Sequence, residues 1–280
     1  MSLTSLQRRR RVLPGFGLSM GVALTYFALI ILLPLVAMAI KTASLGWEQY
    51  WKVITAPRSL ASFRITVTCA LAATVFNASA GLLFAWVLTR YRFPGRRLLD
   101  GLVDLPFALP TAVAGVTLVT LLGPNGWFGR FLEPLGITVA YTPLGIVAAM
   151  FFTSIPFVVR AVQPVLEDVS ADVEEAAKTL GARPWQTFAF VIWPLIMPGF
   201  LAVATMSFAR SLGEFGAVVF IAGNLPMKTE VASLLIFIRL DEYSYGAAAA
   251  LASVLLITAF LLLFLTNTLQ GWALRHARRS

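Results

Sequence analysis

The chain is 280 residues long, with 59% hydrophobic residues, 12% charged residues and a formal net charge of +9. Soluble domains carry about 45–50% apolar and about 25% charged residues, so this composition excludes a water-soluble enzyme, a disordered chain and a collagen-like chain. One cysteine and one histidine, His276 in the last five residues, leave no disulfide framework, no Cys/His metal cluster and no Ser-His-Asp triad.

Six apolar stretches are long enough to cross the bilayer core of about 30 Å, which takes about 20 residues of helix. In chain order they are residues 18–40, 65–89, 101–122, 142–162, 191–221 and 246–269. The sequence therefore predicts an all-α, polytopic membrane protein with six transmembrane helices.

Three of these stretches have features of their own. Four arginines at positions 8–11 precede the first, as in a secretory signal, but its apolar run is about 23 residues where a signal has about 7–15, so we expect a retained helix. Asp104, Pro106 and Pro110 predict an irregular or re-entrant start, or a simple kink, in the third. Arg210 and Glu214 interrupt the fifth.

The basic residues are distributed unevenly between the two sides of these helices. With both termini cytoplasmic, 14 of the 22 lysines and arginines lie inside, seven lie outside, and Arg210 lies at membrane depth. This bias predicts an N-in/C-in arrangement with a basic N-terminus (1–17), a transmembrane domain (18–272) and a basic tail (273–280). Cations beside apolar helices indicate contact with membrane lipid and not with nucleic acid.

The chain contains no Gly-Lys pair and therefore no GxxxxGK[ST] phosphate loop. We expect no nucleotide site and no bound cofactor or metal in this chain. The two halves also lack the matching broken helices of many secondary transporters.

A hydrophilic segment, 163–190, separates the fourth and fifth stretches. Asp172 with Glu175 resembles a capping box, Gly181 fits a left-handed C-terminal cap, and Pro184 prevents continuation, so we predict a short amphipathic helix. Its apolar stripe comprises Val165, Val169, Val173, Ala176, Ala177 and Leu180. A helix lying on the membrane surface is one interpretation; the acidic polar face favours a protein partner.

Within this segment, Glu175-Ala176-Ala177 is followed after three residues by Gly181 and, after nine more, by Val-Ile-Trp-Pro at 191–194. This spacing resembles the EAA loop of type I ABC importer permeases, with Val and Trp in place of the usual Ile and Leu. The resemblance implies that Glu175, Ala176, Ala177 and Gly181 contact a separate ATPase subunit. ATP and Mg²⁺ would then bind to that partner, and this chain would be no enzyme.

Two later segments narrow the resemblance. The sequence FARSLGEFG at 208–216 resembles a segment of sulfate and molybdate permeases, while 221–230 and 239–243 resemble the T-type subunits of sulfate/thiosulfate importers. The resemblance covers most of the chain from about residue 20, and implies the type I permease fold with its core at about 62–268. It also implies sulfate/thiosulfate import across the bacterial cytoplasmic (inner) membrane. The implied partners are a second homologous permease subunit, two ATPase subunits and a periplasmic sulfate-binding protein.

Two alternative functions remain at this point. One is a molybdate/tungstate permease of the same architecture. The other is an ATP-independent secondary anion transporter, for which only Asp104, Arg210 and Glu214 qualify as coupling groups within the membrane.

Arg210 and Glu214 lie four residues apart and share one helix face. Charges at this depth cost about 2.5–3.5 kcal/mol each on insertion scales and usually face a protein or aqueous interior. Arg210 could contact an oxyanion in the pore through forked hydrogen bonds. We favour a structural ion pair, within the chain or across a subunit interface, because Glu214 would repel sulfate.

Overall fold

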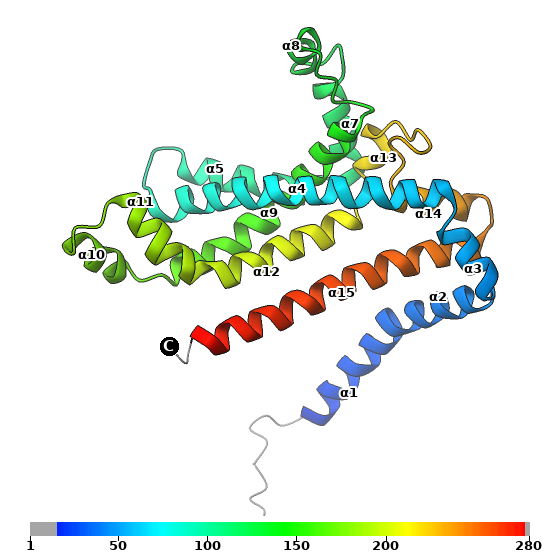
Figure 1. Ribbon diagram of the computed structural model, residues 1–280, viewed down its shortest axis with the longest axis horizontal. Coiled ribbons are helices and arrows are strands. Elements are labelled where there is room, and N and C mark those ends of the chain that lie inside the picture. Colours follow the sequence, from blue (N-terminus) through cyan, green and yellow to red (C-terminus); the bar gives the residue numbers. More distant parts are fainter. Residues whose placement is uncertain (1–15, 278–280) are drawn as a thin grey trace, which may run out of the picture.

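The computed structural model describes residues 16–277, with side chains to Thr268, and every regular element in that part is a helix (Figure 1). The arginines at 8–11 and the side chains of the predicted basic tail lie outside the described residues.

Five helices among the described residues are long and apolar enough to cross a membrane. They are α1–η1–α2 (Phe16–Phe27, Ala28–Leu32, Leu33–Ala43), α4 (Pro57–Arg90), α9 (Pro143–Glu167), α11–η3–α12 (Pro184–Gln186, Thr187–Ile192, Trp193–Leu212) and α15 (Tyr245–Ala277). Shorter helices join them: α3 (Trp47–Ile54), α5 (Arg96–Val103), α6 (Leu105–Ala108), α7 (Thr111–Leu122), α8 (Gly129–Leu132), η2 (Glu133–Leu135), α10 (Ala171–Thr179), α13 (Val218–Ile221) and α14 (Ala232–Asp241).

The third predicted span is not one continuous helix. Its residues belong to α5, α6 and α7, with a break at Asp104 and a second at Pro110, which precedes the first turn of α7. The irregular start is therefore confirmed, and the break follows from proline, which lacks an N–H and fixes its own φ. Because α7 alone is about 18 Å long, a crossing here needs all three helices together. The count of six spans stays a prediction.

The fifth predicted span, 191–221, is wrong at both ends. The helix begins at Pro184, whose missing N–H costs nothing in a first turn, and it ends at Leu212 before Gly213. The chain then turns and forms the short α13. The apolar residues of α13 extended the predicted span, although they belong to a separate element.

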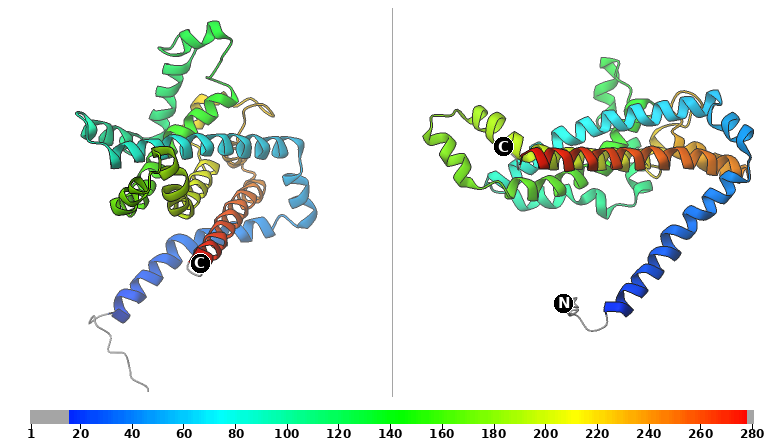
Figure 2. Two further views of the ribbon diagram at one scale, coloured as in Figure 1. Left: turned by 60° about the vertical axis from the view of Figure 1, so that its left-hand side comes forward. Right: turned by 60° about the horizontal axis from the view of Figure 1, so that its bottom comes forward.

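α4, α9 and α12 form the centre of the bundle and bury two apolar clusters, one beside α13 and α14 and one toward α10. Small residues allow the close approach: a Cβ added at Gly81 of α4 would lie 2.4 Å from a methyl carbon of Val158 on α9. In contrast, α1–α2 buries no residue of its own and diverges from the bundle, which it meets through α15 (Figure 2).

Candidate functional site

The α10 helix lies at the end of the bundle where α9 stops and α11 begins (Figure 1). Its N-cap is Ser170, whose hydroxyl accepts the N–H of Asp172 at 3.2 Å, so the predicted start at Asp172 is wrong by two residues. The C-terminus agrees with the prediction. Gly181 has φ +83°, its N–H donates to the carbonyl of Lys178 at 2.9 Å, and the N–H of Ala182 donates to that of Ala177 at 3.0 Å.

The predicted apolar stripe of this segment is only partly buried. Val169 and Ala177 are buried against the rest of the protein. Val173, one turn before Ala177, is 40% exposed, Leu180 is 88% exposed, and Ala176 is exposed between them. Of the four predicted contact residues, Glu175, Ala176 and Gly181 are exposed, whereas Ala177 is turned inward.

Arg90, the last residue of α4, connects α10 to the membrane helices. One of its terminal nitrogens donates to the carbonyls of Leu166 and Val169, each at 3.2 Å, and pairs with a carboxylate oxygen of Glu174 at 2.7 Å. Its guanidinium also lies 5.7 Å from the centre of the Trp86 ring. From the sequence, Arg90 is only one of the cytoplasmic basic residues that indicate the topology and contact lipid, and its partners far along the chain leave no local pattern to find.

Arg210 and Glu214 form an ion pair within the chain, at 2.6 Å. The Glu214 side chain is buried, and its second oxygen accepts the N–H of Ala217 at 3.2 Å. The Arg210 side chain stays 32% exposed, with its guanidinium 5.8 Å from the centre of the Phe157 ring. The pair therefore neutralises a carboxylate that has no access to water, and leaves one edge of the arginine open.

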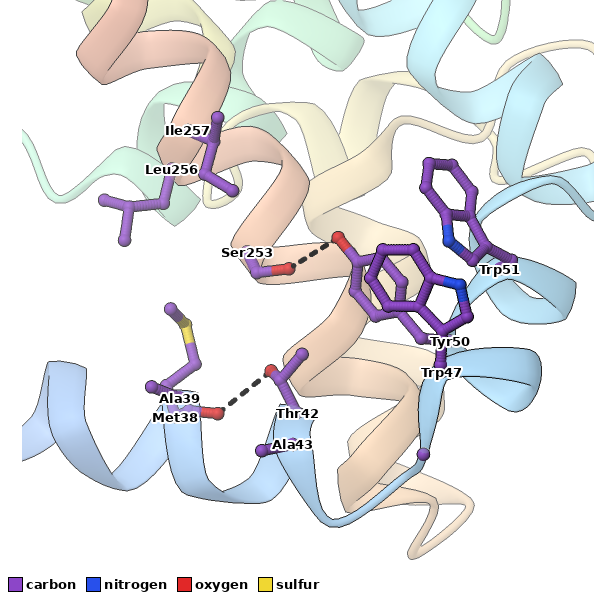
Figure 3. Close-up of a pocket in the computed structure, with 11 residues that line it drawn as sticks. Met38, Ala39, Thr42, Ala43, Trp47, Tyr50, Trp51, Ser253, Leu256 and Ile257 are labelled. Atoms are coloured by element: carbon purple, nitrogen blue, oxygen red, sulfur yellow. Dashed lines mark hydrogen bonds between the residues drawn. The ribbon is translucent and has the colours of Figure 1, made fainter.

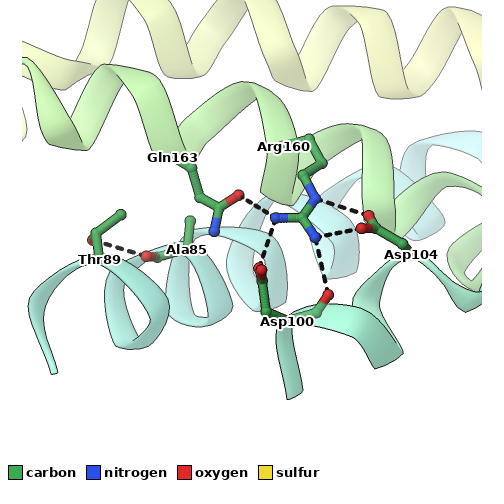
Figure 4. A network of polar contacts seen from close by, with 6 residues as sticks. All are labelled: Ala85, Thr89, Asp100, Asp104, Arg160 and Gln163. Atoms are coloured by element: carbon green, nitrogen blue, oxygen red, sulfur yellow. Dashed lines mark hydrogen bonds and ion pairs between the residues drawn. The ribbon is translucent and has the colours of Figure 1, made fainter. Parts of the chain in front are cut away.

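A second charged network surrounds Arg160 of α9 (Figure 4). Its Nε and one Nη donate to the two carboxylate oxygens of Asp104, in the forked geometry that suits a carboxylate. The other Nη donates to Asp100 Oδ1 at 2.6 Å and Gln163 Oε1 at 2.9 Å, and the carbonyl of Asp100 accepts a further bond at 2.9 Å. All five N–H donors of the guanidinium are thereby used.

This network holds the broken third span against α9. Asp100 lies in α5 and Asp104 at the break after it, so one arginine binds both the end of α5 and the break itself. Sequence analysis named Asp104 as a helix breaker or a coupling group and did not find its partner. A proton-coupling role would need a carboxylate free to change charge, whereas Asp104 and Glu214 are both paired with arginines.

A further ion pair lies at the opposite end of the bundle. Arg58, near the start of α4, donates two hydrogen bonds of 2.8 and 2.6 Å to the fully buried carboxylate of Glu230. About two turns further along α4, the hydroxyl of Thr66 accepts the N–H of Ala232 at 2.8 Å. These contacts fix the segment between α13 and α14 to α4.

An apolar hollow of about 620 Å³ lies between α2, α3 and α15 (Figure 3). Trp47, Tyr50 and Trp51 form one wall, and the Tyr50 hydroxyl lies 3.4 Å from Ser253 Oγ. No charged side chain lines it, so it does not fit a small anion. Aromatic side chains in this position are typical of the membrane–water boundary.

Comparison with known proteins gives a family match over most of the chain. Residues 77–279 match the family model described as "Binding-protein-dependent transport system inner membrane component". The chain is 58% identical over 270 residues to the sulfate transport system permease protein CysT of Escherichia coli (strain K12), covering 96% of each protein. It is 46% identical over 256 residues to the protein of the same name from a Synechocystis species, covering 91% of this chain and 90% of that one.

Solved structures agree on the fold. A chain of a bacterial alginate ABC transporter, crystallised with an alginate-bound periplasmic protein, superposes with a TM-score of 0.76 over 90% of this chain and 92% of that chain, at 16% identity. A chain of the MetNI methionine ABC transporter superposes with a TM-score of 0.57 over 75% of this chain and 93% of that chain, also at 16% identity. At these identities the likeness concerns the fold alone.

Proposed function

This chain belongs to the family of binding-protein-dependent transport system inner membrane components, and we propose that it is the permease subunit of an ATP-driven importer of sulfate and thiosulfate. It spans the bacterial inner membrane with both termini in the cytoplasm. The observation that carries the substrate is the near full-length similarity to sulfate permeases, at 58% identity in the Escherichia coli relative.

The α10 helix is the proposed contact with the ATPase. The apolar side chains of Val173 and Leu180 are exposed on this helix, with Ala176 between them. The exposed surface ends at the glycine turn of Gly181. Burial of an exposed Leu side chain against a partner surface contributes about 1.5–3 kcal/mol to the free energy of association. The small Ala176 and the glycine allow a close approach of the partner's backbone.

The contacts behind α10 provide a route for movement. Arg90 joins Glu174 of α10 to the carbonyls at the end of α9, and is itself the last residue of α4. A displacement of α10 by the ATPase therefore acts on two membrane helices at once. In this proposal ATP and Mg²⁺ bind to the ATPase subunits, and their hydrolysis switches the permease between inward- and outward-facing states.

The proposed assembly contains a second, homologous permease subunit, two ATPase subunits and a periplasmic sulfate-binding protein. Support comes from the family description, which names dependence on a binding protein, and from the fold, which is shared with ABC transporter chains. Within that assembly we propose that Arg210 serves mainly to neutralise the buried Glu214, since the two are paired at 2.6 Å.

Uptake of radiolabelled sulfate, with and without this chain, tests the substrate. We expect uptake that requires the chain, is blocked by excess thiosulfate and is nearly unaffected by molybdate. If loss of the chain abolished molybdate uptake and left sulfate uptake unchanged, the architecture would stand and the substrate would be wrong.

The substitution Gly181→Val tests the coupling surface. Valine at φ +83° is strained by about 1–3 kcal/mol, so the turn should shift and uptake should fall at least tenfold while the protein stays in the membrane. Gly136→Val is the matched control, because Gly136 has φ +73° and open space around it but lies in the loop after η2. Normal uptake by the Gly181 variant would rule out the assignment of α10.

A further inference from the structure

The turn between α4 and α5 carries a cluster of arginines. Arg92, Arg96 and Arg97 line one hollow of about 330 Å³ together with Phe93 and Gly95. Arg92 and Arg97 are exposed and Arg96 is half-buried. Among the described residues none of the three has an acidic partner, in contrast to Arg90. Three unneutralised guanidinium groups around one hollow form a site for an anion.

The backbone adds to this positive charge. Gly95, at φ +87°, turns the chain into α5, and no side chain caps the start of that helix. The N–H groups of its first turn have no partner within the helix, and they lie at the positive end of its dipole. The N–H of Arg96 donates to the carbonyl of Phe93 at 3.3 Å, which leaves the N–H groups of Arg97 and Leu98. Forked cationic donors beside N–H groups at the start of a helix are an arrangement that binds phosphate groups in proteins.

The rest of α5 indicates what kind of molecule carries the anionic group. Leu98 and Leu102, one turn apart, are 69% and 52% exposed, and Tyr91 before the turn is 56% exposed. A short helix with a basic start and an exposed apolar face is typical of an element that lies at the membrane surface. An amphiphile with an anionic head would satisfy both parts of this surface.

We propose that this hollow binds the phosphate of an anionic phospholipid, with the acyl chains along Leu98 and Leu102. Because Arg90 and Glu174 place the end of α4 beside α10, the lipid belongs to the cytoplasmic leaflet if α10 is cytoplasmic as proposed above. Free phosphate and sulfate share the oxyanion chemistry, but they leave the exposed leucines without a partner.

Lipid binding to the intact, purified importer provides the test, with phosphatidylglycerol and phosphatidylcholine as probes and native mass spectrometry as the readout. We expect selective retention of phosphatidylglycerol. The double variant Arg96→Gln/Arg97→Gln should bind it about 25-fold more weakly, since each basic residue near a membrane contributes about fivefold. Arg130→Gln, at an exposed arginine in the short helix α8, is the control and should change nothing.

Three outcomes would overturn the proposal. The double variant could retain phosphatidylglycerol as tightly as the natural protein does, or the two lipids could bind equally well. Displacement of the lipid by millimolar inorganic phosphate or sulfate would mark the hollow as a site for a free anion. If the double variant does not enter the membrane, the single variants Arg92→Gln and Arg97→Gln replace it. Each should weaken phosphatidylglycerol binding about fivefold, and unchanged affinity in both would overturn the proposal. None of these measurements depends on sulfate transport, so they stand apart from the proposed function.

Discussion

At the scale of single residues, the carboxylates buried in this apolar protein are neutralised by arginine partners. Arg160 has five donors in use, and Asp100 and Asp104 depend on it. Arg210 neutralises a buried carboxylate, and Arg58 neutralises another in Glu230. Removing one member of such a pair leaves the other unneutralised, which costs more than the pair contributes.

Arg160→Lys should weaken the attachment of the broken third span even though the charge is kept. Lysine has three donors in place of five and lacks the fork that matches Asp104. We expect a loss of about 1–2 kcal/mol, below the about 3–5 kcal/mol of a fully buried pair because the Arg160 side chain is 32% exposed. Thermal unfolding in detergent measures this change, and an unaltered midpoint would contradict the role given to the network.

The Arg210–Glu214 pair permits a test that separates structure from transport. Arg210→Gln alone leaves Glu214 buried and unpaired, so the amount of folded protein should fall. The double variant Arg210→Gln/Glu214→Gln should restore that amount and show an unchanged KM for sulfate. A restored amount with a KM raised tenfold or more would instead make Arg210 a contact of the anion.

At the scale of elements, close helix packing depends on glycines that face backbone. A Cβ added at Gly115 of α7 would lie 2.5 Å from the carbonyl oxygen of Ala217, which cannot move as a side chain can. Gly115→Ala should therefore cost about 1–3 kcal/mol. Gly101→Ala in α5 meets nothing within 4 Å and provides the control. Equal unfolding midpoints for the two variants would show that α7 is free to shift.

The sequence predicts elements well where one property decides them. Length and apolarity decide the long helices, and the C-terminus of α10 follows from Gly181. The end of the fifth span was missed because apolar residues resume at Val218 after a turn, and hydropathy does not detect the turn. That turn depends on distant contacts, such as the bond of 2.7 Å from Ser233 Oγ to the carbonyl of Glu214.

At the scale of the whole molecule, the proposed N-in/C-in arrangement can be tested directly. The protein has one cysteine, the buried Cys69, so Cys69→Ala gives a background without thiols. In that background we expect Arg130→Cys to react with a membrane-impermeant maleimide in intact cells, and Lys178→Cys to react only after permeabilisation. The reverse pattern would invert the topology and would place α10 outside.

The ion pairs that join the helices could not be predicted from the sequence, because their members lie far apart along the chain. Arg160 and Asp104 are separated by 56 residues, and Arg58 and Glu230 by 172. A single sequence carries no signal that connects such positions, since any acid could pair with any base. The predicted partner for Arg210 was found because it lies one helical turn away.

Because α1–α2 is isolated from the bundle, few of its positions are constrained during sequence evolution by packing inside the subunit. That helix has no buried residue among its 23 α-helical positions or its five-residue π stretch. Outside the part of α2 that meets α15, a substitution in this helix changes no packing inside the subunit, so any apolar residue that fits the bilayer is nearly equivalent to another. Sequence drift within this helix should then be slow only at positions that face α15 or neighbours outside the chain. A comparison of substitution rates along it would map those neighbours without a structure of the assembly.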